Sequence, residues 1–526
     1  STFIIHSDGV VVAEAGALYF GEYGQPTTGG DPKPLAIQIL NLNDGVSSVT
    51  TSAFAETTTT QTGSVTLKDD WKNYSTWEDG GTINFTDVAA GTELAESIKS
   101  QFQAAFGTGT TINFTGTGSG TGSGSSTFDM NVVNALISEG KLASGSVVTS
   151  EALTHTGKAF TLGNTGDMIQ DTGFMGIKGS TGITVKDGKT LTLMGSQASM
   201  AMAVGADTRD ASYVITDAPM ALENGTLKLG HKALSATEGT LAAVTYDRQS
   251  SVNVENGIYT LASLKGEGSL NLSSGTRTDV TGELSATQVT NAGTLTVAGL
   301  TSLGATPEAA STYAAPKSQT FVNENGATAN LTGGLVVNDF ATVKNKTGAT
   351  MNAGAVTVDT FGAINNYEGA KLAYASVNAD GIVRNLGTLN VTGTYAIGDE
   401  GETTFAGDTK VGTLSIGRTA KTMLMARDGQ EAVLHNTGKT YVDELDLVSG
   451  QVMVEKDSIL AGKSLKNGAV GSDIIVSAGG TFGFSHDKSS LENALKNYTG
   501  SKADKAILAL NTDLHFGQGG SLTVGS

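Results

Sequence analysis

One short pattern returns along the second half of this chain at a nearly fixed spacing. Each copy is an apolar residue, any residue, an Asn, one or two further residues and a Gly. In the four clearest copies the Asn residues lie 22, 21 and 19 positions apart. That interval is too long for a hairpin and suits one circuit of a stacked solenoid. The repeated residues are Asn323, Asn345, Asn366 and Asn385, with looser copies at Asn291 and Asn436.

The sequence inside each repeat alternates like a strand. Between Asn345 and Asn366, three short stretches of alternating character (348–352, 355–358 and 361–364) are separated by Asn, Gly and Asp. Such stretches predict three strands per circuit, which is the plan of a parallel β-helix. The expected fold class is therefore mainly β, a β-solenoid. Its 70 Gly, 6 Pro and 6% aromatic residues suit many turns and small inward side chains.

Two kinds of side chain are expected to form ladders along the solenoid. Phe340 and Phe361 each precede an apolar strand residue by three positions, so their rings are predicted to stack coil on coil inside the tube. The repeated Asn is expected at a corner, where Asn tolerates left-handed backbone angles. Its side chain can also hydrogen-bond to the equivalent Asn of the next coil. These residues are therefore interpreted as structural rather than ligand-binding.

The first part of the chain has a different pattern. The segment Thr82–Thr86 recurs in identical form as Thr111–Thr115. Between the copies, apolar residues fall at a spacing of four from Leu94 to Phe106, which predicts an amphipathic helix. A strand, helix, strand unit is thus expected before the solenoid begins.

A run of Gly, Ser and Thr at 116–124 follows that unit and is typical of a linker or a long surface loop. We accordingly predict two domains. Residues 1–126 form a small mixed α/β cap or insertion that ends in the Gly/Ser/Thr-rich segment. Residues 127–526 form the parallel β-helix, which is most regular at 289–450.

Charge and cysteine content narrow the expected environment. The chain has 51 acidic and 32 basic residues, a net charge of −19, which argues against nucleic acid as a partner. It has no Cys, as suits a protein exported through an oxidising periplasm, where an accidental disulfide would be harmful. No apolar stretch is long enough for a membrane helix. We expect an extracellular or outer-surface location and no membrane span in this chain.

Searching for catalytic chemistry gives few candidates. The six His residues are scattered without metal-ligand spacing, and neither a nucleophile elbow nor a phosphate loop accompanies them. Acidic residues cluster at 69–70, at 400–402 and at 443–446, but the most regular coils place no carboxylates at matched positions. The sequence therefore predicts no catalytic residues, no cofactor and no metal. His435, at the variable position of a repeat, is expected to face solvent.

A family resemblance rests on two phrases, Val289–Val297 (VTNAGTLTV) and Val383–Val391 (VRNLGTLNV). They resemble the passenger repeats of Gram-negative autotransporter adhesins, closely over about residues 250–450 and loosely over 145–526. The resemblance implies a right-handed parallel β-helix at the bacterial cell surface, with roles in adhesion, aggregation or biofilm scaffolding. The translocator barrel of that family has no counterpart in this sequence, so any membrane anchor is expected elsewhere.

Three functions from different classes are compatible with these patterns. The first is a non-enzymatic adhesin or biofilm-matrix scaffold, whose partners would be host or cell-surface molecules. The second is a self-assembling filament or surface-layer subunit, whose partners would be other copies of the chain. The third is a polysaccharide-processing β-helix enzyme or a phage tailspike. For the filament, the expected assembly strands contain Phe3, Ile4 and Ile5 near one end and Leu522 and Val524 near the other.

Overall fold

The computed structural model describes residues 181–193, 214–230, 237–305, 319–417, 431–512, 514 and 520–525, together with the backbone of short strands elsewhere. The chain divides into two compact units, Ser1–Ala262 and Ser263–Ser526, called unit 1 and unit 2 below. Both units are built mainly from parallel strands that pair from one coil to the next, and in unit 1 the short strand β13 pairs antiparallel with β17. The predicted mainly-β parallel β-helix is therefore confirmed.

In unit 1 the two identical segments lie on neighbouring strands. Thr82–Thr86 pairs in parallel with Thr111–Thr115, residue for residue, so the sequence repeat is also a structural repeat. The predicted helix at 94–106 lies outside the described residues, and the domain division at residue 126 stays a prediction. The strands of this unit are β1 (Val11–Val12), β2 (Ser48–Thr50), β3 (Ser64–Leu67), β4 (Thr82–Thr86), β5 (Thr111–Thr115), β6 (Val147–Thr149), β7 (Leu153–Thr154), β8 (Ala159–Leu162), β9 (Met168–Gln170), β10 (Ile177–Lys178), β11 (Gly182–Lys186), β12 (Thr190–Leu193), β13 (Ser196–Gln197), β14 (Val214–Thr216), β15 (Met220–Glu223), β16 (Thr226–Leu229), β17 (Thr237–Tyr246) and β18 (Ser251–Val254); β19 (Ile258–Gly266) crosses the division between the units.

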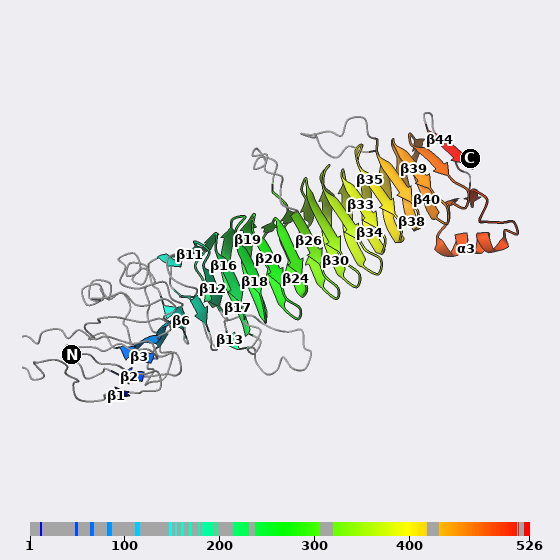
Figure 1. Ribbon diagram of the computed structural model, residues 1–526. Helices are drawn as coiled ribbons and strands as arrows, with labels where there is room; N and C mark the ends of the chain where they lie inside the picture. The colour runs from blue at the N-terminus through cyan, green and yellow to red at the C-terminus, as the bar shows by residue number, and fades with distance from the viewer. Residues whose placement is uncertain are drawn as a thin grey trace, which may run out of the picture. The chain divides into compact units, whose positions relative to one another are not determined.

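In unit 2 one sheet carries the repeated Asn at the ends of its strands. Its members lie side by side in Figure 1, from green to red, and each pairs in parallel with the next. This first sheet consists of β20 (Ser269–Leu272), β23 (Gln288–Asn291), β26 (Gln319–Asn323), β29 (Ala341–Asn345), β31 (Ala363–Asn366), β33 (Ile382–Asn385), β35 (Glu402–Phe405), β37 (Val433–Asn436), β39 (Gln451–Val454), β41 (Asp473–Val476) and β44 (Ser521–Val524).

The rest of each coil forms two separate strands in the early coils of unit 2 and one continuous strand in the later coils. In the early coils the two strands are separate, as the three-strand prediction requires. From β30 onward they are continuous, because β30 pairs with both β27 and β28 of the preceding coil. The second sheet consists of β21 (Arg277–Val280), β24 (Thr294–Val297), β27 (Thr328–Leu331), β30 (Thr350–Val358), β32 (Lys371–Ala379), β34 (Thr388–Ile397), β36 (Asp408–Ile416), β38 (Lys439–Leu447), β40 (Ile459–Val470), β42 (Thr481–Phe484) and β43 (Ile507–Leu510), and the separate third strands are β22 (Leu284–Ala286), β25 (Thr301–Leu303) and β28 (Leu335–Val337).

The core of unit 2 follows from strand alternation. Successive side chains of a strand point to opposite faces, so every second residue enters the tube. In β29 the burial alternates accordingly, with Val343 buried between Phe321 of β26 and Ile364 of β31. Equivalent positions of successive coils thus form rows of stacked apolar side chains, and each coil buries its seam against its neighbours.

The repeated Asn residues form the predicted ladder. Asn291, Asn323, Asn345 and Asn366 each donate from Nδ2 to Oδ1 of the Asn in the next coil, at 2.9, 2.9, 2.9 and 2.8 Å. All five side chains, Asn385 included, are 0% exposed. The predicted left-handed backbone at these positions is wrong, because none of them is among the described residues with positive φ. Each instead ends a regular strand.

The ladder stops where Phe405 occupies the register position next to Asn385. Asn385 donates instead to Oγ1 of Thr409 at 2.9 Å. The Phe405 ring is buried and meets Tyr395 edge to face, with ring centroids 5.2 Å apart. In this coil the buried Phe405 ring thus takes the place of the Asn side chain and of its amide hydrogen bond.

The Phe ladder is confirmed as a stack, but its predicted place inside the tube is wrong. The rings of Phe340 and Phe361 are parallel within 2°, with centroids 5.3 Å apart. Phe340 is nevertheless 48% exposed and has a φ of 65°, so it occupies a turn rather than an inward strand position. The pair therefore stacks on the surface, where two neighbouring turns meet.

Candidate binding groove on the second sheet

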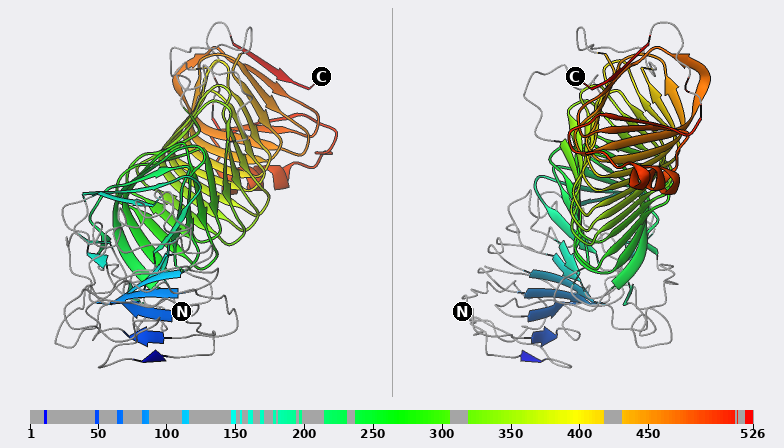
Figure 2. Two further views of the ribbon diagram at one scale, coloured as in Figure 1. Left: turned by 60° about the vertical axis from the view of Figure 1, so that its left-hand side comes forward. Right: turned by 90° about the vertical axis from the view of Figure 1, so that its right-hand side faces the viewer.

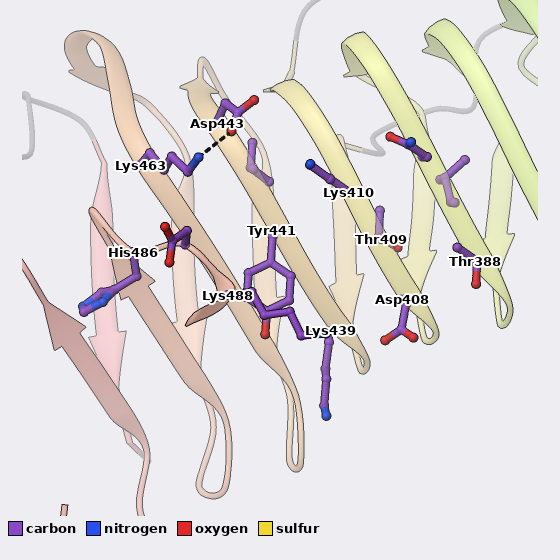
Figure 3. A pocket seen from close by; sticks show the side chains of 14 residues that line it. Thr388, Asp408, Thr409, Lys410, Lys439, Tyr441, Asp443, Lys463, His486 and Lys488 are labelled. Carbon is purple, nitrogen blue, oxygen red and sulfur yellow. Dashed lines mark ion pairs between the residues drawn. The ribbon is translucent and has the colours of Figure 1, made fainter. Parts of the chain in front are cut away.

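Unit 2 carries a groove of about 440 Å³ that crosses several coils. It lies on the outer face of the second sheet, over strands β34, β36, β38 and β40, and it ends at the start of helix α3 (Lys488–Asn497). Figure 3 shows its side chains standing on successive strands. The lining residues are Thr388, Leu389, Asn390, Asp408, Thr409, Lys410, Lys439, Tyr441, Val442, Asp443, Lys463, His486, Asp487 and Lys488.

Strand register brings the polar side chains of the groove together. Asp408 lies beside Lys439, and Lys410 lies beside Tyr441, on the neighbouring strands β36 and β38. Both pairs belong to the outward set of the alternation, since the intervening Thr409 is buried. The coil after Tyr441 offers Ala461 at the same register position. Ala461 is small and 0% exposed.

Helix α3 closes one end of the groove because the sheet beneath it lacks large side chains. Leu491, 0% exposed, is the buried residue of this helix. A Cβ placed on Gly483 would come within 3.2 Å of both methyl groups of Leu491 and 3.5 Å from Ala461. Gly483 and Ala461 thus form a shallow seat for the Leu side chain. Figure 2 shows α3 on the outside of the coils.

The start of α3 is fixed by a capping box. The Asp487 side chain accepts a hydrogen bond from the backbone N–H of Ser490 at 2.7 Å, and the Ser490 hydroxyl accepts one from the Asp487 N–H at 3.0 Å. The hydrogen bonds that the Asp487 carboxyl receives from Ser490 hold its pKa below its usual range. Residues 486–488 are therefore held in place at the mouth of the groove.

Removing the apolar anchor of α3 should release the helix without unfolding the coils. Leu491→Ala is expected to destabilise the docked helix by about 2 kcal/mol, at the low end for a buried Leu, because the exposed helix can relax. The measurement is hydrogen exchange of the amides of 488–497, which should lose protection while those of β38 keep theirs. Equal loss of protection in β38 would show that α3 is part of the cooperative core.

The groove carries positive charge that the protein itself does not neutralise. Lys463 pairs with Asp443 at 3.2 Å, as the dashed line in Figure 3 shows. Within the described part of unit 2, Lys410, Lys439 and Lys488 have no ion-pair partner. Their ammonium groups are free to meet an anionic ligand.

Two side chains in the groove wall have buried polar atoms without a protein partner among the described residues. The Tyr441 hydroxyl and both ring nitrogens of His486, which is 4% exposed, make no hydrogen bond to the described residues. Burial raises the pKa of Tyr441 above its ordinary value of 10.0, and the charges of Glu492 and Asp408 raise it further. The hydroxyl is therefore neutral at physiological pH and able to donate. Buried polar groups are normally paired, so these mark a place that a ligand or water completes.

Removing the unpaired hydroxyl should not weaken the fold. Tyr441→Phe deletes one buried oxygen that has no hydrogen-bond partner among the residues that the structure describes, and such a change is neutral or stabilising. We expect a change in the free energy of unfolding between about zero and 1 kcal/mol, in the stabilising direction, measured by denaturant unfolding. A loss of more than about 1 kcal/mol would mean that the hydroxyl has a structural partner.

The candidate residues from the sequence are spread over other parts of the chain. His435 is half-buried rather than fully solvent-facing, between Glu402 (Nε2 to Oε1, 3.7 Å) and Glu455 (Nδ1 to Oε1, 3.4 Å). Among the described residues, no group of three His, Cys, Asp or Glu side chains is arranged to hold a metal ion. Of the acidic clusters, 443–446 contributes Asp443 to the groove, whereas 69–70 lies outside the described residues.

The predicted assembly strands have different outcomes. Leu522 and Val524 belong to β44, which pairs in parallel with β41 through Ile474 and Val476. Val524 is exposed. Phe3, Ile4 and Ile5 lie outside the described residues, so their contribution to assembly stays a prediction.

Sequence reasoning missed the groove residues and helix α3. A signal for the helix was present, since Asp487 precedes a Ser three positions later and a run free of Gly and Pro. No local signal marked Lys410, Lys439 and Tyr441, because they come together only through strand register across coils.

Within the described part of the chain, no helix is both long and apolar enough to cross a lipid bilayer. Comparisons of the sequence with protein-family models, with curated proteins and with solved structures returned no match.

Proposed function

We propose that this protein is a non-enzymatic, extracellular structural protein of bacteria, an adhesin or biofilm-matrix scaffold built on a β-solenoid. In this role the solenoid supplies a stiff frame and its outer face supplies the contact. The proposal places the protein outside the cell, after export through the periplasm. Its partners are molecules of a cell surface or of the surrounding matrix.

The observation that carries the proposal is the groove on the second sheet. It crosses several coils and is lined by three lysines that have no ion-pair partner among the described residues, on a chain whose net charge is −19. A protein of this sign gains solubility from its acidic surface, so a patch of unpaired positive charge favours a binding role. The buried Asn ladder supports the structural part of the same proposal, because it ties together the successive coils that precede the groove.

The test measures attachment with the full chain coupled to beads. Beads carrying the protein should adhere to extracellular matrix extracted from bacterial biofilms, and beads carrying K410Q/K439Q/K488Q should adhere several-fold less. The matched control is K344Q/K456Q/K502Q, which removes the same charge outside the groove and should adhere like the wild type. Equal adhesion of the wild type and uncoated beads would contradict the adhesin role.

The same material separates a binding protein from an enzyme. Matrix polysaccharide incubated with the protein should release no new reducing ends beyond one per protein molecule. Catalytic release of soluble fragments, abolished by the groove substitutions, would overturn the non-enzymatic part of the proposal. Detection of the native protein only inside intact cells would overturn the extracellular part.

A further inference from the structure

We propose that the groove binds a carboxylated polysaccharide, a chain of uronate-type sugars that lies across strands β36, β38 and β40. This inference rests on the proposed function and names the chemical class of its ligand. The carboxylates of the polymer would pair with Lys410, Lys439 and Lys488. Tyr441 and His486 would contact the sugar rings and hydroxyls between them.

The charge of the groove selects an anionic ligand. It contains four lysines and three aspartates, whereas the whole chain has 51 acidic and 32 basic residues. Two of the three aspartates are already engaged, Asp443 by Lys463 and Asp487 by the first turn of α3. Besides these two, Asp408 and Glu492 of α3 are the acidic groups whose charges act on Tyr441 in the groove. In the described part of unit 2, three lysines without ion-pair partners thus face two such carboxylates, and an anion is favoured.

The arrangement of the lysines suits a ligand with a repeated charge. Lys410, Lys439 and Lys463 come one each from the successive strands β36, β38 and β40, and Lys488 follows at the start of α3. Neighbouring strands lie about 4.8 Å apart. Their register positions differ, since Lys439 lies beside Asp408, Lys410 lies beside Tyr441, and Lys463 follows Gly462, the partner of Val442. The positive groups are therefore staggered across the width of the groove as well as from coil to coil. A linear polymer with one carboxylate per sugar can meet several of them together.

The floor of the groove favours a sugar polymer over an acidic peptide. The backbone N–H and C=O groups of β36 and β38 are used in the ladders to their neighbours, so an extended peptide finds no strand edge to pair with. What the groove offers is the side chains of Tyr441 and His486, whose polar atoms have no hydrogen-bond partner among the described residues. Aromatic faces, hydroxyls and imidazole nitrogens are suited to sugar rings and their hydroxyls.

The test is isothermal titration calorimetry of the full chain with size-defined oligogalacturonate. We expect measurable binding that weakens with added salt, and no binding of a neutral glucan of equal length. K410Q/K439Q/K488Q should weaken binding at least about tenfold, because three charge contacts are lost together. The control K344Q/K456Q/K502Q, with the same change in net charge, should alter it less than about twofold.

A second variant separates ligand contact from fold. Tyr441→Phe is expected to leave unfolding unchanged or improved and to weaken oligogalacturonate binding about threefold or more through the lost hydroxyl. Unchanged affinity in Tyr441→Phe and in the lysine variant would overturn the assignment of this groove as the site. Equal weakening of binding by the groove variant and by the control variant would mean that net charge alone sets the affinity. That result would also overturn the assignment of this groove as the site.

The outcomes distinguish this inference from the proposed function. If poly-glutamate binds as tightly as oligogalacturonate, or the neutral glucan does, recognition of a carboxylated sugar is wrong. In that case bead adhesion that still depends on the groove lysines would leave the adhesin role standing. If oligogalacturonate binds through the groove but beads do not adhere to matrix, the ligand class stands and the proposed function fails.

Discussion

Replacing Phe321 with Ala should lower the free energy of unfolding of unit 2 by about 3 to 5 kcal/mol, the range for a large side chain removed from a packed core. The Phe321 ring is 0% exposed and lies in β26 between Val289 and Val343 of the adjacent coils. A cavity there cannot be filled by movement of one strand, because each coil is held by hydrogen bonds on both sides. Denaturant unfolding of the full chain, followed by circular dichroism, measures the loss.

The matched control is Phe361→Ala. The Phe361 ring stacks on Phe340 at the surface, so its removal takes little buried apolar area from the fold. An aromatic pair of this kind contributes about 0.5 to 1.5 kcal/mol, so the substitution should cost about 1 kcal/mol. If both substitutions cost the same, the inward register of the first sheet has been assigned to the wrong residues.

Phe340 and Phe361 show which structural features the sequence repeat predicts and which it does not. The Asn spacing predicts the length of a coil, because side chains that bond from coil to coil must recur once per circuit. The same argument placed Phe340 and Phe361 in a common column, and they do stack. The prediction that this column lies inside the tube was wrong. Phe340 lies in a turn with a φ of 65°, a conformation that bulky residues rarely adopt and that the spacing of the repeat does not indicate.

The groove was beyond the sequence for a different reason. Lys410 and Tyr441 are 31 positions apart and become neighbours only because β36 pairs with β38 in one register. The segment 418–430 lies between them and breaks the regular spacing of the repeat, so counting residues does not align them. The shape of the groove also depends on Ala461 and Gly483, small residues whose importance appears only when Leu491 is seen against them.

The second large effect is expected in the Asn ladder. Asn345→Ala removes three hydrogen bonds at once: the bond from Asn323, the bond to Asn366 and the bond to the backbone oxygen of Lys371, each 2.9 Å long. The three Asn side chains are 0% exposed, so the amides of Asn323 and Asn366 would lose hydrogen bonds that water cannot replace. We expect a loss of about 3 to 5 kcal/mol in the free energy of unfolding, measured by denaturant titration.

Two controls separate burial from hydrogen bonding. Asn352 donates to Asn330 at the same 2.9 Å, but both side chains are only half-buried, so Asn352→Ala should cost under about 1 kcal/mol. Lys344→Ala, next to Asn345 on the opposite face of β29, should cost under about 0.5 kcal/mol. If Asn345→Ala costs no more than Asn352→Ala, the buried ladder is not a main source of stability.

Coupling along the ladder gives the sharper form of this prediction. Each single variant breaks the hydrogen bond between Asn323 and Asn345 and leaves the amide of the other residue without its partner. The double variant Asn323→Ala/Asn345→Ala breaks that bond once and leaves neither of these two amides behind. The double variant should therefore be more stable than the sum of the single losses implies, by about 1 to 2 kcal/mol. Strict additivity would mean that the Asn residues act independently, each through its own backbone contact such as that of Asn323 with Thr350. Non-additivity would show that the amide chain itself ties one coil to the next.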